Sequence, residues 1–172
     1  NISSYHIGFV IGPCLNASGR LDTARQAIEL MLCMDNEKAH NMAKELIALN
    51  NERKSMTEQE THKAIELVEN TGLLKDRVLV IYLKDCHESI AGIIAGRIKE
   101  RYYRPTFVIT NAEDGAKGSG RSIEGYNMYE EINKCKNVLT KYGGHPMAAG
   151  LSLAISAVSY THLRAHETRH DL

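Results

Sequence analysis

The sequence of 172 residues has 21 lysine and arginine residues and 21 aspartate and glutamate residues, so its formal net charge is zero. A neutral chain has no broad basic field to attract nucleic acid, and contacts with phosphate must come from a few placed side chains. The length fits one or two small domains. No apolar run approaches the roughly 18 residues of a membrane-spanning helix, and no signal peptide is recognised at the start. The missing initial methionine predicts a fragment.

The four cysteines are widely scattered and form no CxxC pair, which argues against a zinc site and a disulfide framework. Such a pattern favours a reduced, cytoplasmic setting. The cysteines are Cys14, Cys33, Cys86 and Cys135.

The first part of the chain is predicted to end in a long helix. Residues 1–21 are expected to form strand and loop, because glycine, proline, asparagine and serine are frequent there. A helix is expected from Asp22 to Met34. From Asn36 to Asn70 the apolar pattern is helical almost without a break, and Gly72 is a suitable stop. A helix of this length with a polar middle is typical of a connector, so we predict a domain boundary inside it.

A β-α-β unit is expected next. Apolar runs over 78–83 and 106–110 are typical of strands that are covered on both faces, as in parallel sheets. The segment between them has helical spacing, and Asp85 and Glu88 are spaced as a capping box at its start. The predicted fold class is therefore α/β, with β-α-β units and a mostly parallel sheet preceded by the connector helix.

Two glycines, Gly92 and Gly96, lie inside the predicted helix of this unit. Each costs about 1 kcal/mol of helix stability relative to alanine. A close approach of another backbone, from a helix or a strand, would explain them, and packing alone is the alternative.

The chain after the β-α-β unit contains two glycine-rich segments. A loop is expected over Asp114–Ser122. A second capping box, Asn127 and Glu130, is expected to start a helix that ends at Gly143-Gly144. A strand is expected over 148–153.

The expected loop could hold an anion. Its segment 118–122 offers backbone N–H groups, two hydroxyls and one guanidinium; glycine lets the backbone come close to a phosphate, and arginine can bind it bidentately. A loop of this composition is more often a solvated turn, and Gly143-Gly144 could be only a helix C-cap.

The order of these pieces is more specific than any one of them, and it resembles a known family. The matching segments are 12–21, 87–97, 103–105, 118–122 and 143–150. Together they resemble the end of the DHH domain and the DHH-associated domain of the RecJ family, in the DHH phosphoesterase superfamily. That family consists of single-stranded-DNA-specific 5′-to-3′ exonucleases of recombination and repair, so the resemblance implies the substrate-gripping part of such a hydrolase. It covers about residues 7–153.

The resemblance also implies domain limits. Residues 1–35 would be the end of the DHH domain, 36–72 the connector helix and 73–157 the DHH-associated nucleic-acid-binding domain.

In this family a pair of divalent metals, manganese or magnesium, activates water. This sequence contains no Asp-His-His cluster, so we expect no catalytic or metal-binding residue, no bound metal and no activity of the fragment alone. Single-stranded DNA is the expected partner; protein partners, oligomeric state and strand-length preference stay open.

Cys14 stands where the family commonly has a basic residue, so one phosphate contact is expected to be missing. The residues implied to bind the strand and its 5′ phosphate are Gly118, Ser119, Arg121, Ser122, Gly144, His145, Asn16 and Arg20.

The loop that carries Ser119 and Arg121 is expected at the carboxyl end of the strand over 106–110. Ligands of open α/β sheets bind at such ends. We therefore expect Ser119, Arg121 and His145 to converge on one anion pocket.

Two alternatives remain. One is another DHH phosphoesterase, acting on short oligonucleotides or cyclic dinucleotides, which shares the Gly-Gly-His motif. The other is a stand-alone nucleic-acid-binding module. Segments 16–20 and 87–97 favour the exonuclease family over the first, and the connector helix argues against the second.

The tail resembles something other than protein-coding sequence. Residues 158–168 match one reading frame of a transposon-type sequencing adapter. His162, His166 and His170 have the spacing of ligands on one helix face, but the adapter resemblance outweighs a metal site. We predict that 158–172 is a translated-adapter artefact outside the fold.

Overall fold

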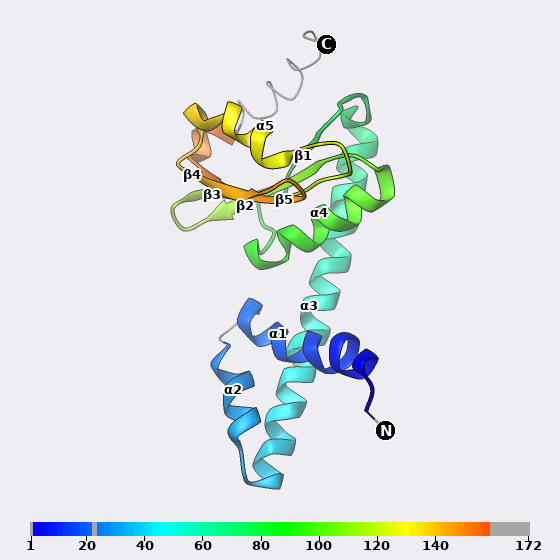
Figure 1. The fold of residues 1–172 in the computed structure, drawn as a ribbon, viewed down its shortest axis with the longest axis vertical. Coiled ribbons are helices and arrows are strands. Elements are labelled where there is room, and N and C mark those ends of the chain that lie inside the picture. The colour runs from blue at the N-terminus through cyan, green and yellow to red at the C-terminus, as the bar shows by residue number, and fades with distance from the viewer. Residues whose placement is uncertain (1, 22–23, 159–172) are drawn as a thin grey trace. The chain divides into compact units, whose positions relative to one another are not determined.

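The computed structural model describes residues 2–21 and 24–158. The chain forms two compact units, Asn1–Glu58 and Gln59–Leu172, which divide inside the long helix α3 (Asn36–Asn70). The domain limits expected from the sequence stay a prediction. Figure 1 shows the elements of both units.

The first unit is helical from Ser4 to Leu21, so the strand and loop expected in this part of the chain are wrong. It contains a π-helix η1 (His6–Ile11), α1 (Gly12–Leu21), α2 (Arg25–Leu32) and the first part of α3. Helix α2 lies inside the helix expected over 22–34.

Pro13 is the reason that the sequence pattern misleads there. The N–H of Gly12 donates to the carbonyl of Ile7, five residues back. Proline lacks an N–H and its ring crowds the preceding turn of an α-helix. The wider π turn before Pro13 lets the helix continue through a position that usually breaks it.

Helix α3 confirms the predicted long helix. The Asp35 Oδ1 accepts hydrogen bonds from the backbone N–H groups of Glu37 and Lys38, at 2.9 and 3.1 Å, which caps the first turn. Beyond the other end, Gly72 has φ +78°, the left-handed conformation that commonly terminates a helix.

The second unit is built on a five-stranded sheet of order β1-β2-β3-β5-β4. Strands β1 and β2 are parallel and are joined by helix α4 (Glu88–Tyr102), which confirms the α/β class and the β-α-β unit. The strands are β1 (Leu79–Tyr82), β2 (Thr106–Ala112), β3 (Gly115–Arg121), β4 (Lys141–His145) and β5 (Ala148–Leu153).

The expectation of a mostly parallel sheet is wrong, because the other three strand pairs are antiparallel. Only two residues connect β2 to β3, and two connect β4 to β5. A two-residue connection can form a hairpin, whereas a parallel pair needs a crossover of a dozen residues or more.

Helices cover both faces of the sheet. Helix α4 packs on β2 and β3, and α5 (Met128–Lys134) lies on the opposite face against β4 and β5 (Figure 1). On the α5 side, Phe107, Met128, Ile132 and Ala149 form a buried cluster.

The helix ends differ in part from expectation. His87, not Asp85, caps α4, and its Nδ1 accepts from the N–H of Ser89 at 3.3 Å. Asn127 caps α5 as predicted, with its Oδ1 accepting from Glu130 N–H at 3.3 Å.

Helix α5 does not run to Gly143. It ends at Lys134, and a 3₁₀ turn (Lys136–Val138) leads into β4. Gly143 and Gly144 disfavour a helix, while the pairing of β4 with β5 satisfies the extended backbone.

Val158 belongs to the fold, although the adapter match includes it. Its side chain is 5% exposed and packs against Ile109, Ala116 and Leu153. The rest of the predicted artefact, with its three histidines, lies outside the described residues.

The boundary between fold and tail can be tested by stability. Val158→Ala removes about two buried carbon groups at about 0.8 kcal/mol each, so the free energy of unfolding should fall by about 1–2 kcal/mol. Truncation after Val158 should leave the melting temperature unchanged. A lower melting temperature of the truncated chain would show that the tail contributes to the fold.

Candidate nucleic-acid interface

Alternate side chains of β3 face α4. The Lys117 Nζ forms a 2.7 Å salt bridge with the Glu88 carboxylate at the start of α4, and the Arg121 guanidinium lies against Gly92 in the same helix. Side chains alternate between the faces of a strand. Lys117, Ser119 and Arg121 therefore share the α4 side of the sheet.

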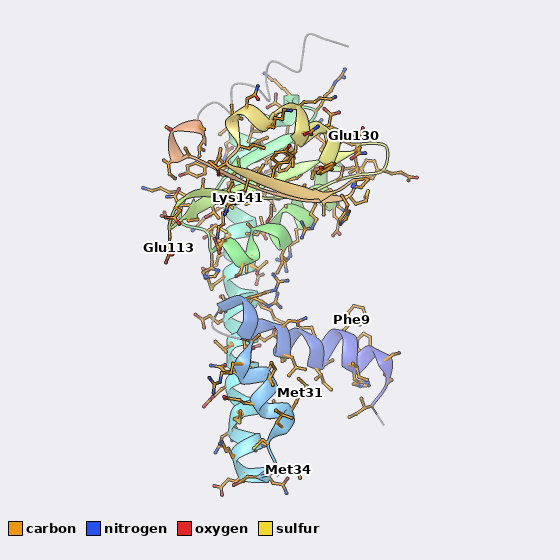
Figure 2. All side chains as sticks on the ribbon, turned by 60° about the vertical axis from the view of Figure 1, so that its left-hand side comes forward. Phe9, Met31, Met34, Glu113, Glu130 and Lys141 are labelled. Carbon is orange, nitrogen blue, oxygen red and sulfur yellow. The ribbon has the colours of Figure 1, made fainter. Side chains whose placement is uncertain are left out.

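The position of Tyr142 shows which residues of β4 lie on the α4 side of the sheet. Its hydroxyl donates to the Asn133 Oδ1 of α5 at 2.8 Å, so Tyr142 is on the α5 side. Its neighbours Lys141 and Gly143 therefore face the α4 side. Figure 2 shows Lys141 on this strand, apart from Glu130 on α5.

Strand register aligns these residues in three rows across β3, β5 and β4. Neighbouring strands are about 4.8 Å apart, so the outer members of one row are separated by about 10 Å at their Cα atoms. The rows are Arg121–Ala148–His145, Ser119–Gly150–Gly143 and Lys117–Ser152–Lys141.

The glycine-rich segment is thus a strand and not the expected loop. Arg121 pairs with Thr106, at the amino end of β2, so the expected position at the carboxyl end is wrong. The glycines meet a packing demand. A Cβ at Gly120 would lie 2.5 Å from both the Met128 sulfur and the Phe107 ring.

Gly92 makes room for Arg121. A Cβ at Gly92 would lie 2.8 Å from the Arg121 Nη2, and Nη1 of the same guanidinium donates to the Gly120 carbonyl at 2.7 Å. The close approach expected at this helix is therefore made by a side chain rather than a backbone. Nothing lies within 4 Å of a Cβ at Gly96, and nothing in the structure explains that glycine.

The two glycines provide a matched test. Gly96→Ala should raise the free energy of unfolding by about 1 kcal/mol through helix propensity. Gly92→Ala should gain less, because the new methyl displaces the guanidinium of Arg121. Paired denaturant titrations measure the difference, and equal gains would show that Gly92 is not reserved for the arginine.

A cavity of about 380 Å³ lies between the start of α4 and strands β3, β5 and β4. The hydroxyls of Ser119 and Ser152 make no hydrogen bond among residues 2–21 and 24–158. The hydrogen bond to Glu88 raises the pKa of Lys117 above its ordinary value, so that group stays charged. The polar lining residues are Glu88, Ser89, Lys117, Ser119, Lys141 and Ser152.

His145 is exposed at the end of β4. Its Nδ1 accepts from the Met147 N–H at 3.4 Å. In the neutral ring the proton is then on Nε2, which is available to donate.

The other expected site residues lie elsewhere. Ser122 is buried, and its hydroxyl donates to the Tyr126 carbonyl at 2.7 Å. Asn16 and Arg20 belong to α1 of the first unit, are exposed, and are one turn apart on one helix face.

Ser119 is the one polar residue of the cavity lining that the sequence predicts as a site residue, and the other five, Lys117, Lys141 and Ser152 among them, are additions from the structure. The alternation of Lys117, Ser119 and Arg121 has the period of two that a strand requires, and it was the available signal.

No group of three or more His, Cys, Asp or Glu residues that could hold a metal occurs within the described ranges. Over the same part of the chain, no helix has the length and apolarity needed to cross a membrane.

Comparison with known proteins decides the family. Residues 75–159 match the DHHA1 domain. The single-stranded-DNA-specific exonuclease RecJ of Bacillus subtilis (strain 168) is 39% identical over 164 residues, which are 94% of this chain. The RecJ of Escherichia coli (strain K12) is 39% identical over 160 residues, 88% of this chain. The chain belongs to the RecJ family.

This RecJ family chain spans 21% and 28% of the length of those two relatives. Solved RecJ structures share its fold. An exonuclease RecJ bound to manganese matches with TM-score 0.86 and 26% identity, covering 99% of this chain and 42% of that one. RecJ of Thermus thermophilus in complex with Mn²⁺ matches with TM-score 0.84 and 28% identity, covering 95% and 24%.

Proposed function

We propose that this chain is the DNA-gripping part of a single-stranded-DNA-specific exonuclease that degrades strands from the 5′ end in recombination and repair. The relatives named above are single-stranded-DNA-specific exonucleases. The observation that carries the proposal is the row in which Arg121 and His145 flank Ala148 on one face of the sheet. The four free cysteines fit a reducing, cytoplasmic compartment.

The 5′ phosphate would lie between Arg121, Ser119 and His145. Arginine supplies a permanent charge and a planar fork suited to phosphate. The hydroxyl of Ser119, which makes no hydrogen bond to the described residues, and the Nε2–H of His145 add two donors. Because the whole chain is neutral, these local donors, and not a diffuse field, would hold the strand.

The remaining expected contacts differ in their support. Gly118 and Gly144 alternate with Ser119 and His145 and so face the α5 side, where they would contribute to binding only through their backbone groups. Asn16 and Arg20 stay proposed contacts of the first unit. Ser122 is left out of the proposed contacts, since its hydroxyl is committed to Tyr126.

The metal chemistry would be supplied elsewhere in the parent protein. RecJ structures contain Mg²⁺ or Mn²⁺, and such ions can activate water for attack on a phosphodiester. The described residues offer no cluster that fits them, so no step of hydrolysis is assigned to this chain.

The proposal is tested with the parent exonuclease restored to full length. With manganese, it should release mononucleotides from the 5′ end of a labelled single strand and leave the matching duplex intact. The 172-residue chain alone should release none. Degradation from the 3′ end, or of duplex at the same rate, would contradict the assigned activity, and release by the chain alone would contradict the location of the chemistry.

A further inference from the structure

We propose that Lys117, Ser152 and Lys141 form a second phosphate site, which takes an internucleotide phosphate beside the terminal one. The inference rests on the proposed function and extends it, because it predicts where the strand runs after its 5′ end. Glu88 holds Lys117 in the free protein and is displaced by the DNA.

The position of the row follows from strand register. Lys117 is two residues from Ser119 along β3, or about 7 Å, on the same face. Nucleotides in a B-form strand rise about 3.4 Å each, and an extended single strand is longer per nucleotide. Successive phosphates of an extended strand can therefore meet successive rows.

Two of the three residues in the middle row are glycines. Gly150 and Gly143 stand beside Ser119 in the middle row, and a Cβ at Gly143 would meet nothing within 4 Å. A phosphate backbone can approach this part of the sheet closely, because neither residue places a side chain in its way.

Two residues of the row Lys117–Ser152–Lys141 carry hydrogen-bond donors that have no protein partner among the described residues. Lys141 is exposed and forms no salt bridge within the described ranges, and the Ser152 hydroxyl makes no hydrogen bond there. Both line the same cavity as Ser119. An ammonium group binds phosphate as a point charge with rotatable donors.

Glu88 is the one carboxylate that lines this cavity among the described residues. Its Oε2 is 2.7 Å from the Lys117 Nζ, so an incoming phosphate must compete for that ammonium group and lie near a like charge. Removal of this charge should strengthen binding.

The α5 face offers a matched control. Lys134 and Glu131 form a salt bridge of the same length, 2.7 Å, with similar exposure of both side chains. Because α5 is on the opposite side of the sheet, the variants Lys134→Ala and Glu131→Gln make the same charge changes away from the groove.

The test uses the full-length parent exonuclease with EDTA, so that no strand is hydrolysed. 5′-Phosphorylated mono-, di- and trinucleotides compete with a fluorescent single strand. Lys141→Ala and Lys117→Ala should each weaken the trinucleotide about 5-fold, between the effects of an exposed ion pair and of a charged hydrogen bond. The mononucleotide should be unaffected. For a longer strand, each variant should reduce the slope of log affinity against log salt concentration by about 0.7, the value for one lost phosphate contact.

Glu88→Gln should tighten the trinucleotide by a similar factor, while the two α5 variants should change nothing. Equal loss for mono- and trinucleotide, or equal effects of Lys134→Ala and Lys141→Ala, would overturn the second site. An unchanged affinity in Glu88→Gln would overturn the role of Glu88. If the wild-type enzyme does not prefer single strands, the proposed function itself fails, which is a separate outcome.

Discussion

Replacing Arg121 by alanine is expected to weaken binding of 5′-phosphorylated single strands about 10- to 150-fold, because a hydrogen bond to a charged group contributes about 1.5–3 kcal/mol net. The loss should be smaller for the same strand with a 5′ hydroxyl, since the terminal phosphate is what the guanidinium fork holds. The measurement is a pair of equilibrium titrations of the full-length enzyme, one for each strand end. Equal weakening for the 5′-phosphorylated and the 5′-hydroxyl strand would contradict the assignment of Arg121 to the terminal phosphate and would indicate only general binding of the DNA backbone.

Three further variants test whether the effect depends on where the Arg121 charge lies or only on the loss of a positive charge. Arg97→Ala removes an exposed guanidinium from α4, the helix that also contacts Arg121. Arg97 is five residues from Gly92, which places it about 140° away around the helix axis. Arg97→Ala should not change end selectivity. Gly92→Ala keeps the charge and moves it, so it should reproduce part of the Arg121→Ala effect, whereas Gly96→Ala should not.

The elements that the sequence predicts well are those whose own residues specify them. Helix α3 has a regular apolar spacing, an Asp35 cap and a glycine stop, and all three lie within or directly beside its own sequence. The β1-α4-β2 unit follows from apolar runs of the right length. Local signals and tertiary structure agree in these segments.

Strands β3 and β4 could not be recognised in the same way. Both are rich in glycine, a residue depleted in strands, and they are strands because β2 and β5 satisfy their backbone groups. The partners become visible only in the folded sheet. The site shows the same limit: family resemblance names Ser119 and Arg121, but Lys117 joins them only once the segment is known to alternate between faces.

Gly144→Ala is expected to cause the largest loss of stability. A Cβ at this position would lie 2.4 Å from the Ala148 carbonyl oxygen and 2.6 Å from the Ala149 Cα, and the residue has φ +154°. These neighbours are backbone atoms of the paired strand, so rotation of a side chain cannot relieve the overlap and β4 must move away from β5.

The free energy of unfolding should fall by about 2–5 kcal/mol, the sum of a strained backbone conformation and an overpacked contact. Gly143→Ala is the control, because its Cβ would meet nothing within 4 Å and its φ is not in the left-handed range. A surface change of that kind stays within about 0.5 kcal/mol. Chemical denaturation of both variants measures the contrast. If the two alanines cost the same, the hairpin does not depend on a residue without a side chain at position 144, and the register that aligns His145 with Arg121 has another cause.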